Sequence, residues 1–238
     1  MHPRSFPRAL SALGIGLLLL ACEPSTTEET AAMEPAPEKK APNVLMIIVD
    51  DLNDWIGVMG GHPDTRTPNM DKLASEGTLF MNAHATAAIC GPSRASVMTG
   101  LRPSTTGIYE QLSDREIKQA GPATENITFM TEYFAQHGYK TMGIGKIFHN
   151  GAPDGSIEEY AGRIRGFGPH PEDEFVWDSD RTNTDWGVYP ERDEDMSDYK
   201  SARWAKQKLA EANHRPFVRT VGCVRPNAAG RRLSSPAT

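Results

Sequence analysis

The stretch Asn-Val-Leu-Met-Ile-Ile-Val at residues 43–49 constrains the fold of this chain more than any other feature. Its apolar residues follow one another without alternation, which predicts a central strand buried on both faces of a parallel sheet. The run ends in Asp50 and Asp51. Ligand sites of open α/β sheets lie at the carboxyl ends of strands. The sequence therefore predicts an α/β fold with a mostly parallel central sheet flanked by helices, and a candidate site directly after this strand.

The adjacent carboxylates of Asp50 and Asp51 have two explanations. Neighbouring carboxylates repel each other unless a positive charge lies between them. A hard divalent cation such as calcium or magnesium supplies that charge and takes oxygen ligands. Alternatively, one aspartate caps a turn and the other is solvated. These residues alone leave both explanations open.

A second informative stretch is Cys-Gly-Pro-Ser-Arg-Ala-Ser-Val-Met-Thr-Gly at residues 90–100. Pro92 suits the first turn of a helix, and residues 93–98 continue it. Cys90 then lies near a helix N-terminus, where the dipole and the free N–H groups favour anions. The alternative is that Cys90 is a buried structural thiol.

Residues 139–149 predict a strand followed by Gly145, Lys146 and, three residues later, His149. Glycine lets the backbone pass close to a ligand. At this spacing the lysine and the histidine can both point at one anionic group. The alternative is a solvated lysine and a surface histidine.

These stretches together resemble type I sulfatases. Residues 90–100 are similar to the family signature C-x-P-S-R-x-x-x-[LM]-T-G, and residues 145–149 match its G-K-x-F-H segment. The resemblance covers roughly residues 43–226, and with Arg-Pro at 225–226 it favours the iduronate-2-sulfatase-like branch. It implies an alkaline-phosphatase-like sandwich, of which this chain holds the N-terminal part.

The resemblance also implies a chemistry. In the family, the cysteine of the signature is oxidised to Cα-formylglycine by a formylglycine-generating enzyme or an equivalent maturase, and the hydrated aldehyde attacks the sulfur of a sulfate ester. Arg94 would hold the hydrate, Lys146 would stabilise charge on the sulfate, and His149 would accept a proton. The resemblance thus assigns catalytic roles to Cys90, Arg94, Lys146 and His149, and calcium (magnesium less readily) to the ligands Asp50, Asp51 and Cys90.

A sulfated polysaccharide or oligosaccharide is the substrate that the resemblance favours. Competing readings are a phosphodiesterase or phosphonate hydrolase of the same superfamily, and a lipid-anchored binding protein or inactive fragment. The net charge is −6, and the globular part has no basic block, so we expect no nucleic-acid partner. The three cysteines show no paired spacing, which argues against a disulfide framework and a zinc site: Cys22, Cys90 and Cys223.

The first 22 residues predict export. Two arginines precede an apolar run at 9–20 that is too short for a comfortable membrane span and has the form of a secretory signal. The run ends in Leu-Leu-Ala-Cys, which resembles a bacterial lipobox and implies a lipid on Cys22; the alternative is a plain signal peptide with Cys22 incidental. We predict a lipoprotein-type signal peptide at 1–22, and a location at the bacterial outer membrane or the periplasmic face of the envelope.

Residues 23–42 are rich in Glu, Pro, Thr and Ala and predict a disordered tether. The sulfatase-like part follows at 43–226. Its resemblance ends after Pro226, because Asn227 stands where the family has histidine, and 227–238 has no apolar period. We interpret this tail as out-of-frame translation or a truncated gene, with the rest of a sulfatase encoded beyond codon 238. A sheet stopped midway exposes apolar strands and leaves a calcium shell incomplete, so we expect little activity from these 238 residues alone.

The remaining segments follow ordinary helix and strand patterns. Residues 154–195 have no sustained period, which is typical of a lid or pocket wall. In the helix at 196–213, Tyr199, Ala202, Ala205 and Leu209 predict the apolar face. The other predicted elements are a helix at 67–77 with Thr67 as N-cap and Gly77 as stop, a strand at 78–85, a helix at 126–136 and a strand at 215–222.

Overall fold

The computed structural model describes residues 41–164, 166, 168–169 and 190–224. The predicted signal peptide, all but the last two residues of the tether, the tail at 227–238 and much of the irregular stretch at 154–195 lie outside these residues and stay predictions. Within the described part, no helix combines the length and the hydropathy needed to cross a bilayer.

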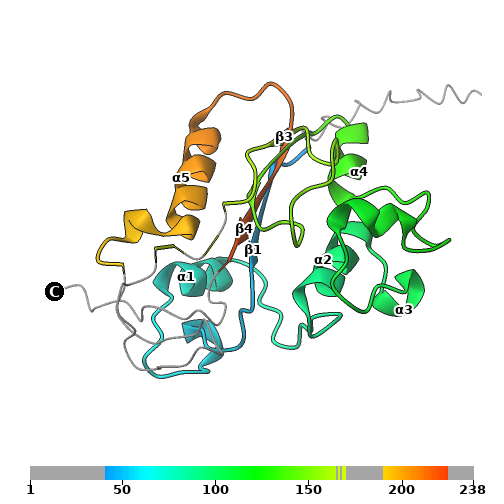
Figure 1. The fold of residues 1–238 in the computed structure, drawn as a ribbon. Coiled ribbons are helices and arrows are strands. Elements are labelled where there is room, and N and C mark those ends of the chain that lie inside the picture. Colours follow the sequence, from blue (N-terminus) through cyan, green and yellow to red (C-terminus); the bar gives the residue numbers. More distant parts are fainter. Residues whose placement is uncertain (1–40, 165, 167, 170–189, 225–238) are drawn as a thin grey trace, which may run out of the picture. The chain divides into compact units, whose positions relative to one another are not determined.

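A four-stranded parallel sheet forms the centre of the described chain (Figure 1). Its strands lie in the order β1-β4-β2-β3, so that β4, the last in sequence, pairs with both β1 and β2. This arrangement confirms the parallel sheet predicted from residues 43–49. The predicted central position of that strand, buried on both faces, is wrong for the described residues: β1 has only β4 as a neighbour, so Leu45 and Ile47 are 45% and 58% exposed. The strands are β1 (Val44–Val49), β2 (Lys140–Gly145), β3 (Glu159–Tyr160) and β4 (Phe217–Cys223).

Helices cover both faces of this sheet, with α2 and α4 on one side and α5 on the other (Figure 1). The fold thereby has the layered α/β architecture that was expected. The helices are α1 (Pro68–Glu76), α2 (Cys90–Thr99), α3 (Pro103–Thr106), α4 (Met130–Gln136) and α5 (Ser197–Ala210), and the 3-10 turns are η1 (Gly57–Met59), η2 (Asp114–Gln119) and η3 (Asp193–Asp195).

The main core lies on the face covered by α2 and α4. Phe129 and Phe148 meet edge to face, with ring centroids 5.3 Å apart, and both are essentially inaccessible to solvent. Phe148 belongs to the loop that follows β2, so this loop is fixed by the core. The buried members of this cluster are Ala95, Met98, Ile108, Ile117, Phe129, Ile147, Phe148 and Ile157.

The opposite face has a smaller core, made of Ile144, Ala205 and Val221. Of the apolar face predicted for α5, Ala205 is buried, but Tyr199, Ala202 and Leu209 are exposed, and Ser197 and Ser201 are buried instead. Small side chains bring the helix close to the sheet, and the Ser201 hydroxyl lies in van der Waals range of the Cβ position at Gly145, 3.4 Å away. The helix therefore faces the sheet through Ser197, Ser201 and Ala205, with Trp204 packed beside them, and not through Tyr199 and Leu209.

Two further predictions need correction. Residues 78–85 form no strand: no described strand runs beside them to accept their backbone hydrogen bonds, and Phe80 is 74% exposed. The helix predicted from residue 126 begins only at Met130, because the Glu132 carboxylate accepts the Phe129 N–H at 2.8 Å and so starts the helix there. The boundaries of α1, with Pro68 in its first turn and Gly77 as its stop, are confirmed.

Candidate active site

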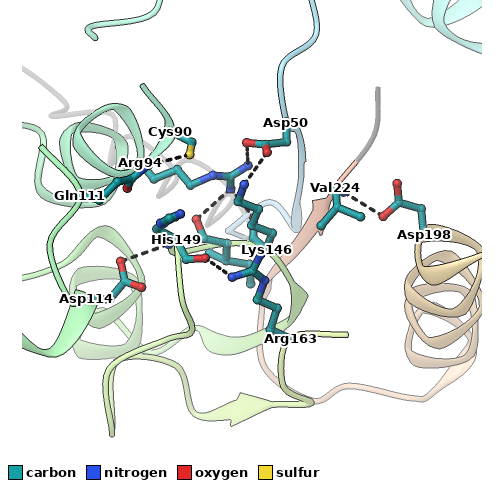
Figure 2. A network of polar contacts seen from close by, with 11 residues as sticks. Asp50, Cys90, Arg94, Gln111, Asp114, Lys146, His149, Arg163, Asp198 and Val224 are labelled. Atoms are coloured by element: carbon teal, nitrogen blue, oxygen red, sulfur yellow. Dashed lines mark hydrogen bonds and ion pairs between the residues drawn. The ribbon is translucent and has the colours of Figure 1, made fainter. Parts of the chain in front are cut away.

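Two strand ends and one helix start meet at the candidate site (Figure 2). Asp50 follows β1 and Lys146 follows β2, whose carboxyl ends lie at the same edge of the parallel sheet. Glycine permits this convergence: a Cβ at Gly222 would lie 2.1 Å from the Lys146 carbonyl carbon. The Lys146 N–H donates to the Gly222 carbonyl at 2.9 Å. The lysine backbone therefore crosses directly over the end of β4.

A buried carboxylate and two cations form the centre of the site. The Asp50 Oδ1 atom lies 2.7 Å from Arg94 Nη2, and its Oδ2 atom lies 2.5 Å from Lys146 Nζ. Each of the three residues is no more than 5% exposed. Arg94 Nη1 also donates to the carbonyl oxygens of Lys146 and, at 3.1 Å, of Ile147. Arg94 thus ties the end of β1 to the chain that leaves β2.

The electrostatics of this group favour an anion next to it. Burial raises the pKa of Asp50, but the hydrogen bonds and charges of Lys146 and Arg94 outweigh burial and hold that pKa below its usual value. The carboxylate is therefore ionised at neutral pH. Two positive charges against one negative charge leave a net positive group in a poorly solvated place.

Cys90 is the first residue of α2 and is partly exposed. Its Sγ atom accepts a hydrogen bond from the Gln111 side-chain amide at 3.1 Å. Arg94 lies one helical turn later, on the same face of α2. In the first helical turn the N–H groups of residues 90 and 91 have no partner within the helix, since residue 92 is proline and the Ser93 N–H donates to the Ile89 carbonyl at 3.2 Å. Cys90 therefore combines a helix N-terminus with an arginine one turn away.

His149 lies in the loop after β2, three residues beyond Lys146. Burial is the strongest influence on His149 and lowers its pKa. The nearby Asp114 carboxylate opposes this effect, and the positive charges that reinforce it come from Lys146, Arg163 and Arg94. The imidazole is thus neutral at neutral pH. Its Nδ1 atom is buried and has no hydrogen-bond partner in the part of the chain that the structure describes.

The metal ligands implied by the resemblance do not form a cation site by themselves. Both carboxylate oxygens of Asp50 already bind Arg94 and Lys146. Asp51 is exposed and takes a left-handed backbone conformation with φ of 59°. Among the described residues, no group of three or more His, Cys, Asp or Glu side chains is arranged to hold a metal ion. The assignment of Asp50, Asp51 and Cys90 as ligands therefore stays a prediction.

Three functional contacts escaped the sequence analysis. Gln111 contacts Cys90, Asp114 accepts hydrogen bonds from the backbone after Phe148, and Arg163 Nη1 donates to the His149 carbonyl at 2.5 Å. Gln111 and Asp114 lie in a stretch without a helix or strand period, where only their polarity was visible. The predicted residues Asp50, Arg94 and Lys146 are brought into direct contact by the fold.

Comparison with known proteins identifies the family. Residues 42–230 match the family model described as Sulfatase. This chain belongs to the sulfatase family. It is 44% identical over 225 residues to a sulfatase of Formosa agariphila, an alignment that covers 90% of this chain and 43% of that protein. It is 42% identical over 139 residues to human iduronate 2-sulfatase, which covers 58% of this chain and 24% of that protein.

The chain accordingly spans less than half the length of these two relatives. Solved structures share its fold. The phosphonate monoester hydrolase of Agrobacterium radiobacter superposes with a TM-score of 0.54 at 20% identity, over 78% of this chain and 41% of that one. A protein solved in complex with its substrate D-glucosamine-2-N,6-O-disulfate gives a TM-score of 0.53 at 22% identity, over 79% of this chain and 35% of that one. The predicted alkaline-phosphatase-like architecture is thereby confirmed for the N-terminal part.

Proposed function

We propose that this chain carries the N-terminal part of the catalytic domain of a sulfuric ester hydrolase that releases sulfate from a sulfated carbohydrate. One observation carries the proposal. In a chain that matches the sulfatase family over residues 42–230, Cys90 starts α2 one turn before Arg94, which is joined through Asp50 to Lys146. A reactive group at Cys90 therefore faces a net positive site suited to a sulfate ester.

Each side chain has a role in this proposal. Cys90, oxidised by a formylglycine-generating enzyme or an equivalent maturase, supplies as the hydrated aldehyde the hydroxyl that attacks sulfur. Lys146 and the free N–H groups at the start of α2 attract the sulfate oxygens. Arg94 holds the carbonyl groups of Lys146 and Ile147, and so fixes the direction of the lysine. His149, neutral at neutral pH, accepts a proton at a ring nitrogen.

A divalent cation belongs to the proposal only in part. Calcium, with magnesium less favoured, would take oxygen ligands from Asp50 and Asp51. The described residues do not complete such a shell, and Asp50 is already neutralised by two cations. We therefore place further ligands outside the described residues and assign no step of the reaction to the ion.

The proposed substrate is a sulfated polysaccharide or its oligosaccharide fragments. Two comparisons support this class: a relative named iduronate 2-sulfatase, and a similar fold solved in complex with its substrate, a sulfated glucosamine. Both statements concern those proteins. Their common chemistry, a sulfate ester or sulfamate on a sugar, fits a site that presents positive charge beside a partly exposed residue.

We also propose export to the bacterial envelope and a lipid anchor on Cys22, on the basis of the sequence Leu-Leu-Ala-Cys that ends at this residue. Growth with a radioactive fatty acid should label the wild-type chain and not a Cys22→Ala variant. Cys223→Ala is the matched control and should keep the label. Equal labelling of the Cys22→Ala variant would refute the anchor.

Two measurements test the enzymatic proposal. The first is mass spectrometry of the Cys90 peptide after co-production of the chain with a formylglycine-generating enzyme, because the oxidised motif is local to 90–100. The second is sulfate release from an aryl sulfate and from sulfated oligosaccharides. The locus is first resequenced past codon 238, and the protein that the corrected reading frame encodes is then assayed. We expect an aldehyde at Cys90, and turnover that is lost in Cys90→Ala and retained in Cys223→Ala.

The same assays separate the competing functions. An aryl phosphodiester tested in parallel and hydrolysed faster than the aryl sulfate would favour the phosphodiesterase or phosphonate hydrolase class. An unmodified Cys90 thiol, together with no sulfate release from any substrate, would favour an inactive lipid-anchored fragment. Sulfate release that survives Cys90→Ala would refute the assignment of Cys90.

A further inference from the structure

Asp114 is a buried carboxylate outside the Asp50–Arg94–Lys146 group. In the described hydrogen bonds its side chain accepts only from backbone N–H groups of one other segment. Its carboxylate accepts three consecutive N–H groups of the loop after β2; Figure 2 shows the contact with His149. Oδ1 lies 3.1 Å from the His149 nitrogen, and Oδ2 accepts from Asn150 and, at 3.1 Å, from Gly151. Asp114 is 5% exposed. A buried carboxylate thus occupies an anion-binding concavity of backbone N–H groups.

The segment that begins at Gln111 and ends at Asp114 also reaches the proposed nucleophile. Gln111 donates to Cys90 Sγ at 3.1 Å, and the closeness of this contact is visible at Gly91, where a Cβ would lie 2.1 Å from Gln111 Oε1. Leu112, between the two polar residues, packs against the main core. One short segment therefore contacts the start of α2 at one end and the His149 loop at the other.

Lys146 and His149 depend on this segment to different degrees. Lys146 is fixed independently, through its side-chain contact with Asp50 and its backbone N–H bond to Gly222. The described bonds that hold the His149 backbone come from Asp114 and from Arg163, which donates to the His149 carbonyl. Loss of the Asp114 acceptor should therefore displace His149 more than Lys146.

We infer that Asp114 is a positioning residue that sets the place of His149 relative to Cys90, through the segment 111–114. This inference rests on the proposed function for its catalytic meaning. A carboxylate is required because it offers two acceptor oxygens and no donor. In Asp114→Asn one oxygen is replaced by an NH₂ group, which faces one or two backbone N–H donors whichever way the amide is turned. The loop must then move or lose hydrogen bonds.

The first test is hydrogen exchange on the 238-residue chain, and it needs no turnover. In Asp114→Asn, exchange at residues 149–151 should accelerate about 10-fold or more while exchange in α2 is unchanged, because only the loop loses its acceptor. Asp154→Asn is the matched control, since it makes the same charge change on a side chain that is 93% exposed. Unchanged exchange at 149–151 in Asp114→Asn would overturn the inference.

The second test is a double-mutant cycle on the protein that releases sulfate. Asp114→Asn should lower kcat on the order of 10- to 100-fold, since small misplacements of a catalytic group cost that much. In a His149→Ala background the same change should lower kcat by less than about 3-fold, because Asp114 acts through His149. Equal losses in the two backgrounds would show a general structural role and overturn the inference.

A third variant keeps the inference testable if Asp114→Asn does not fold. Asp114→Glu keeps both acceptor oxygens and displaces them by one methylene group, so that it should fold and show a smaller loss of kcat. Wild-type kcat in Asp114→Glu would overturn the positioning role. If the wild-type protein releases no sulfate but Asp114→Asn still accelerates exchange at 149–151, the proposed function fails and the role of Asp114 in holding the loop stands.

Discussion

The two faces of the sheet differ in how completely the described residues cover them. On the face of α2 and α4, eight buried side chains form one cluster, and the candidate site lies at its edge. On the face of α5 the buried cluster has three members. Leu45 and Ile47 of β1 are 45% and 58% exposed. Arg219 of β4 is fully buried, although its three guanidinium nitrogens find no hydrogen-bond partner among the described residues.

This difference indicates that the candidate site depends on the better packed half of the sheet. Between Lys146 and His149 lie Ile147 and Phe148, which are members of the larger cluster. The other face leaves apolar surface on β1 uncovered by described residues, as expected for a chain that spans less than half the length of its relatives. Stability measurements on single variants can test this contrast.

The largest effect should come from the packed face. Phe148→Ala removes a fully buried ring that meets Phe129 edge to face, and should lower the free energy of unfolding by about 3–5 kcal/mol. Ile47→Thr keeps a β-branched side chain on the exposed part of β1 and should change it by less than about 0.5 kcal/mol. Urea titration of both variants measures the contrast. Equal losses would show that the two faces are equally well covered.

Arg219 should give an effect of the opposite sign. Its buried guanidinium packs over the Phe217 ring, 4.0 Å from the centroid, but lacks hydrogen-bond partners in the described part of the chain. Arg219→Met removes an unpaired buried charge and keeps an apolar chain of similar length, and should raise the free energy of unfolding by about 1–3 kcal/mol. Arg203→Met, at an exposed position of α5, is the control and should be near neutral. A lower free energy of unfolding in Arg219→Met would mean that the guanidinium has hydrogen-bond partners in solution.

The same contrast explains how far the sequence could predict this structure. The convergence of Asp50, Arg94 and Lys146 was predictable, because strand ends of a parallel sheet meet at one edge and a motif placed Arg94 one turn after Cys90. Each of these signals is local or follows a general rule of topology.

Other features depend on contacts between distant segments. Asp114 binds residues 35 to 37 positions away, and no periodicity marks such a contact. The strand predicted at 78–85 had suitable composition, but a strand requires a neighbour, and composition does not reveal whether one exists. The buried side of α5 includes Ser197 and Ser201 beside Ala205, and apolar periodicity alone does not identify buried serines.

A smaller effect should appear in the pH dependence of stability. The folded state holds the pKa of His149 below its ordinary value of 6.5, mainly through burial. The unfolded chain therefore binds a proton first as the pH falls, so stability is complete above pH 6.5 and declines below it, by at most about 1.4 kcal/mol per pH unit. Measurements between pH 8 and 5 avoid the titration of Asp50, whose pKa lies below 3.8.

The variant His149→Gln tests the origin of this slope. It removes the titrating group and should flatten the decline between pH 6.5 and 5. His214→Gln is the matched control, because His214 is exposed, and it should keep the wild-type slope. An unchanged slope in His149→Gln would assign the decline to another group.

The smallest effect should be that of calcium on this chain. A cation that binds the folded state with Kd near 10 mM adds only about 0.4 kcal/mol at 10 mM calcium, a rise in Tm of roughly 1–2 °C. We expect no more than this, because both oxygens of Asp50 already bind Arg94 and Lys146 and the described residues contain no group of three metal-binding side chains. Asp51→Asn removes one of the two proposed carboxylate ligands and should reduce this small rise further. Micromolar calcium affinity by calorimetry, lost in Asp51→Asn, would contradict this expectation and show that the packed face completes a metal site without the rest of a longer sulfatase.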